Sequence, residues 1–168
     1  MIHVCSLARL AATVETTGAR HIVTLINAET PVPRPPAVAP ENHLFLGMHD
    51  IPHALDGYTA PCEAHVDALL DFVTAWDRTA PMVVHCFAGI SRSTAAAFVA
   101  ACALNPHRDE ARIAADIRRM SPTATPNPLI VALADRRLGR RGRMVSAIEA
   151  IGRGIDAYEG HPFRLDLE

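Results

Sequence analysis

A cysteine and an arginine six residues apart, Cys86 and Arg92, are the residues whose types and spacing point most directly to chemistry. The thiolate is the reactive form of cysteine, and the planar fork of arginine can hold two phosphate oxygens at once, which lysine cannot do. Ser93 directly follows the arginine, and its hydroxyl could donate to the Cys86 sulfur and help it leave. Together the three side chains predict transfer of a phosphoryl group to and from sulfur.

The residues around Cys86 predict a cradle for a phosphate group. An apolar run, residues 81–85, precedes the cysteine as a strand would, Gly89 lies in a short loop, and an alanine-rich helical segment begins at Arg92. A strand, a tight loop and a helix in this order turn backbone N–H groups and the helix N-terminus toward one small concavity. These donors and the guanidinium favour a thiolate, so we expect Cys86 to be strongly acidified. The predicted phosphate-binding residues are Phe87, Ala88, Gly89, Ile90, Ser91 and Arg92.

The segment from His85 to Ser93 resembles the signature loop of the cysteine-dependent protein tyrosine phosphatases, His-Cys-x-x-Gly-x-x-Arg-Ser/Thr. The mid-chain position of the loop and the small size of the chain resemble the dual-specificity-like bacterial branch. Residues 18–27 look like the second strand of this family, and the resemblance extends loosely over residues 18–138. It implies a phosphocysteine intermediate, hydrolysis without metal or cofactor, and an aspartic general acid on a separate loop. It also implies that His85 hydrogen-bonds nearby backbone and supports the loop.

Two aspartates, Asp50 and Asp56, are candidates for the general acid that protonates the leaving group. Asp50 comes straight off a predicted strand, where the family usually keeps this acid. Asp56 lies ten residues before Val66, the first inward position of the next predicted helix, and that offset also resembles the dual-specificity pattern. The sequence leaves both open, and we favour Asp50 because the end of a strand positions a side chain more firmly than the middle of a loop.

Several histidines near the first of these aspartates raise the question of a metal site. His49 and His53 stand four residues apart, a spacing that suits metal binding on a helix, and His43 and His65 are near them in the sequence. Pro52 lies between the first pair and argues against a helix there. We therefore predict no metal site and no cofactor.

Length and composition favour one globular domain that spans residues 1–168. A net charge of −2 supplies no field that would recruit nucleic acid or an acidic membrane. The four cysteines are too few and too widely spaced for a disulfide framework, and a thiolate enzyme needs a reducing compartment, so we predict a cytoplasmic location. No apolar run approaches the roughly eighteen residues of a membrane span.

The hydrophobic pattern predicts an α/β fold with a central, mostly parallel sheet of four to five strands flanked by helices. The signature loop connects the last core strand to a buried helix, residues 92–104, which is small and apolar nearly all round. The N-terminal order of strand, helix and strand implies a parallel βαβ unit. We expect residues 139–168 to form a C-terminal helical extension outside the family resemblance. The other predicted elements are strands 2–5, 21–27, 43–48 and 81–85, helices 7–17, 61–78 and 143–158, and two helices capped by Asp109 and Asn127.

These features predict a phosphomonoester hydrolase that acts on phosphotyrosine in proteins or on similar aryl phosphates. One alternative is a phosphatase of a phosphoinositide, a nucleotide or another small phosphate, but inositol lipids usually require basic loop residues, and the variable loop positions supply none. A second alternative is a phosphate-binding regulatory module with low turnover, against which the complete set of Cys86, Arg92 and Ser93 speaks. The oligomeric state stays open.

Overall fold

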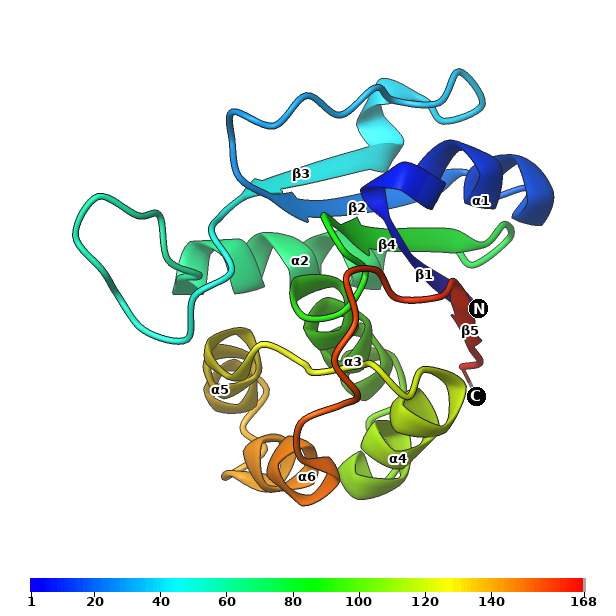
Figure 1. Ribbon diagram of the computed structural model, residues 1–168. Helices are drawn as coiled ribbons and strands as arrows, with labels where there is room; N and C mark the ends of the chain where they lie inside the picture. The colour runs from blue at the N-terminus through cyan, green and yellow to red at the C-terminus, as the bar shows by residue number, and fades with distance from the viewer. Residues whose placement is uncertain (168) are drawn as a thin grey trace.

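A five-stranded sheet forms the centre of the computed structural model, which describes residues 1–167 (Figure 1). The strand order is β3-β2-β4-β1-β5, and the first four of these run parallel while β5 pairs antiparallel with β1. The predicted α/β fold with a mostly parallel sheet is therefore confirmed. The strands are β1 (Ile2–Ser6), β2 (His21–Ile26), β3 (His43–Gly47), β4 (Met82–Cys86) and β5 (Phe163–Leu165).

Helices cover both faces of this sheet (Figure 1). On one face, α1 closes a small core that contains Leu10, Ile22 and Val83. On the other face, α2 and α3 cover the sheet in the larger core, and α4, α5 and α6 pack beyond them. The helices are α1 (Leu10–Thr17), α2 (Glu63–Ala75), α3 (Arg92–Leu104), α4 (Glu110–Met120), α5 (Pro128–Arg137) and α6 (Arg143–Ile151), with 3-10 turns at Leu7–Arg9 and Pro40–Asn42.

Strand β4 and helix α3 hold the loop between them in a rigid frame. Every residue of β4 is buried, and so is every residue of α3 from Arg92 to Cys102. Because β1, β2 and β4 are parallel, their carboxyl ends meet at one edge of the sheet, which is where ligands bind in sheets of this kind. At that edge Ser6 pairs with Cys86, and Asn27 follows the end of β2.

Three details differ from the sequence predictions. Strands β1 and β2 are parallel but not adjacent, because β4 lies between them. The predicted helix 7–17 begins as a 3-10 turn, and only its part from Leu10 is α-helical. The predicted helix 143–158 ends at Ile151, because Gly152 takes a φ of +62° that side-chain-bearing residues rarely adopt, and the chain leaves the helix there.

Instead of continuing as a helix, the chain after Gly152 forms an extended segment, residues 152–162, which we call the C-terminal strap. It runs from α6 back past the loop between β4 and α3 and leads into β5 at the edge of the sheet (Figure 1). The side chain of Arg118 fixes its start by donating to the carbonyl oxygens of Ile151 and Gly152, at 2.6 and 2.8 Å. The predicted helical extension is thus corrected to one helix, a strap and a short strand.

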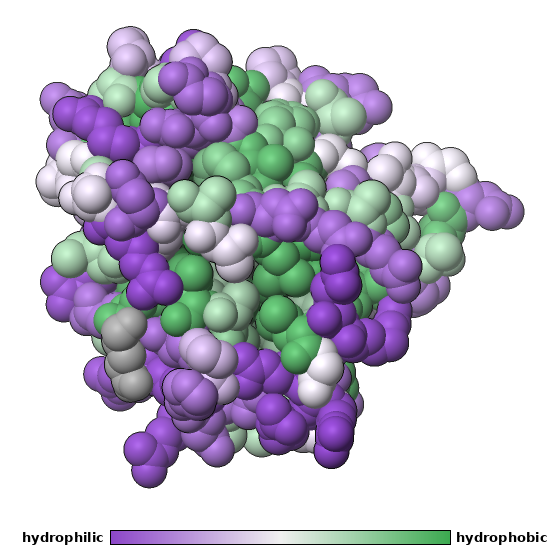
Figure 2. Space-filling model, turned by 180° about the vertical axis from the view of Figure 1, so that it is seen from behind, coloured by the Kyte–Doolittle hydropathy of each residue, from purple (hydrophilic) through white to green (hydrophobic). Residues whose placement is uncertain are grey.

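The surface of the molecule is mixed in character. On the face shown in Figure 2, hydrophobic residues reach the surface near the middle and hydrophilic residues surround them. Two exposed aromatic side chains belong to segments that meet near the sheet edge: Phe87, after β4, is 64% exposed, and Tyr158, in the C-terminal strap, is fully exposed. None of the helices in residues 1–167 is long and apolar enough to span a bilayer.

Candidate active site

Cys86 is the last residue of β4, and hydrogen-bond donors surround its sulfur. Its Sγ lies 3.1 Å from the Ser93 hydroxyl and accepts from the backbone N–H of Gly89 at 3.3 Å. The residue is 2% exposed, so the sulfur is held inside the loop and not on the outer surface. The predicted contact between Ser93 and the sulfur is present.

The other buried cysteines have different surroundings. Cys5 and Cys102 belong to the two hydrophobic cores, whereas Cys86 belongs to neither. Burial raises the pKa of Cys5 and of Cys102 to about 12, so both thiols stay protonated. Cys62 is exposed at the start of α2, where its sulfur contacts His65. Cys86 is thus distinguished from the other cysteines by its contacts with Ser93 and with the backbone of Gly89.

Four carbonyl groups of the signature loop, residues 86–92, are bonded to backbone N–H groups outside the loop. Because the C=O and N–H of a peptide point in opposite directions, these bonds leave the N–H groups to face inward and form an anion-binding cradle. The bonds run from Leu7 N to Phe87 O (3.1 Å), Gly160 N to Ala88 O (2.9 Å), Thr125 N to Ile90 O (2.9 Å) and Ala95 N to Ser91 O (2.9 Å).

Gly89 is required in this loop for two physical reasons. Its φ is +74°, in the left-handed region that favours glycine. A Cβ at this position would also lie 2.8 Å from the backbone of Cys5 and Ser6, at the end of β1. A side chain here would therefore push the loop away from the sheet edge.

Arg92 is the first residue of α3, and its side chain turns inward with 6% exposure. Its Nη1 donates to the carbonyl of Met48 at 2.7 Å and to Oδ1 of Asn27 at 3.1 Å. Its Nε is buried and has no partner within residues 1–167. A buried donor left unpaired is costly, so this atom is a ready partner for an oxyanion held in the cradle.

His85 is fully buried and supports the loop from beneath. Its Nδ1 lies 3.4 Å from the carbonyl of Cys86, and its Nε2 lies 2.7 Å from the hydroxyl of Thr24. The same hydroxyl lies 2.7 Å from Nε2 of His43, so the two rings and the threonine form one hydrogen-bonded chain. Burial is the main cause that lowers the pKa of His85 to about 4, which leaves the ring neutral near neutral pH.

Of the two candidate acids, Asp50 lies at the signature loop. Its Oδ1 accepts from the hydroxyl of Ser91 at 2.7 Å and from the side-chain amide of Asn127 at 2.8 Å. Asp56 lies in an exposed turn of the same segment, and its carboxylate makes no hydrogen bond to any residue of the described part. The structure therefore brings Asp50, and not Asp56, together with the predicted phosphate-binding residues.

Three of the four histidines considered for a metal site have separate partners, and His53 is exposed. His43 contacts Thr24, His65 contacts the N-cap residue Cys62, and His49 accepts from the backbone of Thr59 at 3.0 Å. His49 also packs edge-on against Tyr58. Within residues 1–167, no three potential ligands lie close enough together to hold a metal ion.

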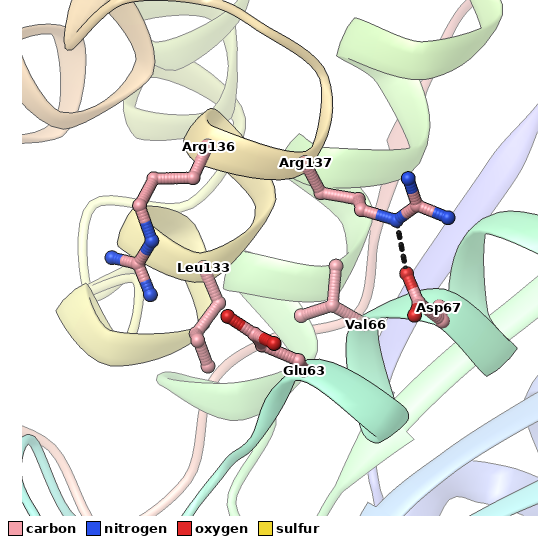
Figure 3. A pocket seen from close by; sticks show the side chains of 6 residues that line it. All are labelled: Glu63, Val66, Asp67, Leu133, Arg136 and Arg137. Atoms are coloured by element: carbon pink, nitrogen blue, oxygen red, sulfur yellow. Dashed lines mark hydrogen bonds and ion pairs between the residues drawn. The ribbon is translucent and has the colours of Figure 1, made fainter.

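A cleft of about 440 Å³ between α2 and α5 does not involve the signature loop (Figure 3). Val66 and Leu133 form its apolar part, and acidic side chains from α2 face basic side chains from α5 across it. The ion pair between Asp67 and Arg137 joins the two helices at one side. This cleft therefore lies between two helices of the scaffold, and none of the described residues that line it is a nucleophile.

Three contributors to the site were not predicted from the sequence. Asn27 holds Arg92, and the rule that ligand-binding residues follow parallel strands could have identified it. Asn127 caps α5 as predicted, but it also holds Asp50, and a capping pattern does not reveal that second contact. The C-terminal strap reaches the loop through Gly160, and no local signal predicts a contact between residues so far apart.

Comparison with known proteins bears on the fold of the chain and not on its site. No protein-family model matches the sequence, and no curated protein matches it with significance. Among solved structures, human DUSP28 superposes with a TM-score of 0.64 at 22% identity and covers 83% of this chain and 89% of its own. DUSP15 gives a TM-score of 0.65 at 18% identity and covers 89% of both chains.

A third similar structure is the human tyrosine phosphatase-like serine/threonine/tyrosine-interacting protein, with a TM-score of 0.64 at 15% identity. It covers 83% of this chain and 92% of its own. The chain therefore has the fold of the dual-specificity phosphatases, as its signature loop led us to expect. The assignment to a bacterial branch is not tested by these structures and stays a prediction.

Proposed function

We propose that this chain is a cysteine-dependent phosphatase that hydrolyses phosphotyrosine in proteins through a phosphocysteine intermediate. The observation that carries the proposal is the sulfur of Cys86 at the floor of a loop whose carbonyls are bonded outside it. Six residues on, Arg92 keeps a buried, unpaired Nε for the bound oxyanion. The fold shared with dual-specificity phosphatases agrees with this reading.

In the first step the thiolate of Cys86 attacks phosphorus in line with the bond to the leaving oxygen. The S–P bond forms as the P–O bond breaks, and the loop N–H groups and Arg92 hold the oxygens of the transferring group. Asn27 and Met48 fix one end of the guanidinium, so the cation is already oriented when substrate arrives. This preorganisation lowers the cost of stabilising the transition state.

Asp50 supplies the proton that the leaving phenolate takes. Ser91 and Asn127 fix its carboxyl group at the rim of the loop, where a leaving group would sit. In the second step the same carboxylate accepts a proton from water as the water oxygen attacks phosphorus and the S–P bond breaks. Ser93 donates to the departing sulfur and stabilises it as an anion.

The charges near the site favour a phosphotyrosine side chain over a polyanionic inositol lipid. Apart from Arg92, the signature loop carries no cation. The acidic residues Asp50, Asp156 and Glu159 lie on the segments beside the loop and would repel further phosphate groups. A reducing compartment such as the cytoplasm suits an enzyme that depends on a thiolate.

A binding module without turnover is the second candidate. One of the similar structures is a human protein named as tyrosine phosphatase-like and as serine/threonine/tyrosine-interacting. Its name describes a protein of this fold by what it interacts with. Here the nucleophile, the arginine, the serine and a positioned acid are all present, which favours turnover.

The test is hydrolysis of p-nitrophenyl phosphate in the presence of a chelator. We expect turnover by the wild type, none by Cys86→Ser, and a loss of at least about a thousandfold in Arg92→Ala, since both phosphate orientation and charge stabilisation disappear. Arg112→Ala, an exposed arginine on α4, is the matched control. Tight binding of a phosphotyrosine peptide without release of phosphate would favour the binding module, and turnover retained in Cys86→Ser would refute the proposal.

A further inference from the structure

A cleft of about 250 Å³ lies directly beside the signature loop, and the C-terminal strap forms its far wall. Ile90 and Ser91 line it from the loop, Thr125 lines it from the segment between α4 and α5, and Arg153 and Ile155 line it from the strap. Because Ser91 also holds Asp50, the cleft adjoins the place where the leaving group would sit. It is large enough for one side chain of a bound peptide.

Hydrogen bonds between its walls give this cleft its shape in the free protein. The backbone N–H of Gly154 donates to the hydroxyl of Thr125 at 3.0 Å, and that of Ile155 donates to the carbonyl of Pro122 at 2.9 Å. Thr125 in turn donates from its backbone to Ile90 at 2.9 Å. The strap, the α4–α5 segment and the signature loop are therefore joined, and little ordering remains to be done when a ligand enters.

Arg153 is the one cation among the side chains of residues 1–167 that line the cleft. In the free protein its guanidinium is paired with the carboxylate of Asp156. Its Nη2 and Nε donate to one oxygen of Asp156 at 2.5 and 3.2 Å. The side chains of Arg153 and Asp156 are 78% and 83% exposed, and exposed pairs of this kind contribute little to stability. A carboxylate from a ligand can therefore replace Asp156 at small cost.

We propose that this cleft binds an aspartate or glutamate side chain next to the phosphotyrosine of a protein substrate, with Arg153 as the residue that recognises it. The inference rests on the proposed function and names the substrate class for the same site. A carboxylate fits better than a second phosphate, because a dianion would face both Asp156 and Asp50 with only one cation to offset them. Asp156 then competes with the substrate for Arg153.

The test uses phosphotyrosine peptides that carry a single glutamate at one of the two positions before or the two positions after the phosphotyrosine. Each is compared with the same peptide carrying glutamine in place of the glutamate. We measure kcat/KM with the wild type and, by fluorescence anisotropy, affinity for Cys86→Ser, which requires no turnover. At least one glutamate peptide should be preferred by about three- to tenfold, and high salt should reduce this preference. Arg153→Gln should bring the ratio close to one, and Asp156→Asn should increase it. Arg112→Gln, which removes an exposed charge on α4 and not in the strap, should leave the ratio as it is.

Two results would overturn the inference: the same glutamate preference in Arg153→Gln as in the wild type, or an equal loss in Arg112→Gln, which would indicate bulk charge alone. A peptide with phosphoserine in place of glutamate distinguishes the other source of negative charge. If its affinity depends on Arg153 and that of the glutamate peptide does not, the carboxylate assignment is wrong. Failure to hydrolyse p-nitrophenyl phosphate would refute the proposed function alone, since the anisotropy measurement still tests the cleft.

Discussion

The contact between the C-terminal strap and the signature loop predicts the effect of Gly160→Ala. The backbone N–H of Gly160 donates to Ala88 O at 2.9 Å, and a Cβ on this residue would lie 2.8 Å from the carbonyl oxygen of Gly89. That distance is about 0.6 Å short of an ordinary contact, which begins at 3.4 Å. Because this nearest atom belongs to the backbone, the loop or the strap must move to make room.

The size of the effect follows from this displacement. Overpacking of this kind costs about 1–3 kcal/mol of stability, and a shift of several tenths of an ångström in a loop that holds the reacting group should lower kcat about tenfold. The assay measures kcat and KM on p-nitrophenyl phosphate, inhibition by orthovanadate, and the melting temperature. Affinity for orthovanadate should fall together with kcat, since the same loop N–H groups bind the vanadate oxygens and the oxygens of the transferring phosphoryl group.

Two variants separate this effect from general destabilisation. Gly154→Ala introduces a comparable clash, 2.6 Å from the backbone of Thr123, elsewhere in the strap, so it should cost similar stability with a smaller loss of kcat. Tyr158→Ala removes a fully exposed side chain and should change neither quantity. If Gly160→Ala loses stability while kcat and vanadate inhibition stay at wild-type values, the strap does not position the loop and the reasoning is wrong.

Three further predictions follow from single contacts in the site. Asp50→Asn should lower kcat on aryl phosphates about a hundredfold or more and remove one limb of the pH profile, whereas Asp56→Asn should leave both close to the wild type; the opposite pattern would make Asp56 the acid. Ser93→Ala should slow hydrolysis of the phosphocysteine more than its formation, which rapid mixing would detect as a burst of nitrophenol; a steady release without a burst would contradict it. Burial lowers the pKa of His85 to about 4 in the folded protein, so the unfolded chain binds the proton first as pH falls. The free energy of unfolding should therefore be at its full value above about pH 6.5 and decrease by roughly 3 kcal/mol toward pH 4. Denaturant melts should find this pH dependence reduced in His85→Gln and unchanged in His107→Gln.

The signature loop could be predicted because its chemistry is local. The nucleophile, the glycine, the arginine and the serine lie within eight consecutive residues, and a strand and a helix of unmistakable pattern flank them. Hydrophobic periodicity likewise placed β1 to β4 and α3 within a residue or two of their ends. All of these elements except β3 bury most of their side chains.

The parts that could not be predicted depend on contacts between distant segments. The position of Asp50 relies on Ser91 and Asn127, which are 41 and 77 residues away in the chain. Strand β5 has three residues, too few for an alternating pattern to stand out, and it forms only because β1 offers an open edge. The helical spacing of apolar residues continued past Ile151, but Gly152 and the carbonyl contacts of Arg118 ended the helix there.

The central claim is that phosphate passes through the sulfur of Cys86, and trapping that intermediate tests it most directly. The enzyme is mixed with an aryl phosphate in the presence of a chelator, quenched in acid within milliseconds, digested, and analysed by mass spectrometry. Our account predicts one phosphate per chain on the peptide that contains Cys86, in greater amount in Ser93→Ala and absent in Cys86→Ser. Phosphate on another residue, or turnover by Cys86→Ser with no trapped adduct, would contradict it.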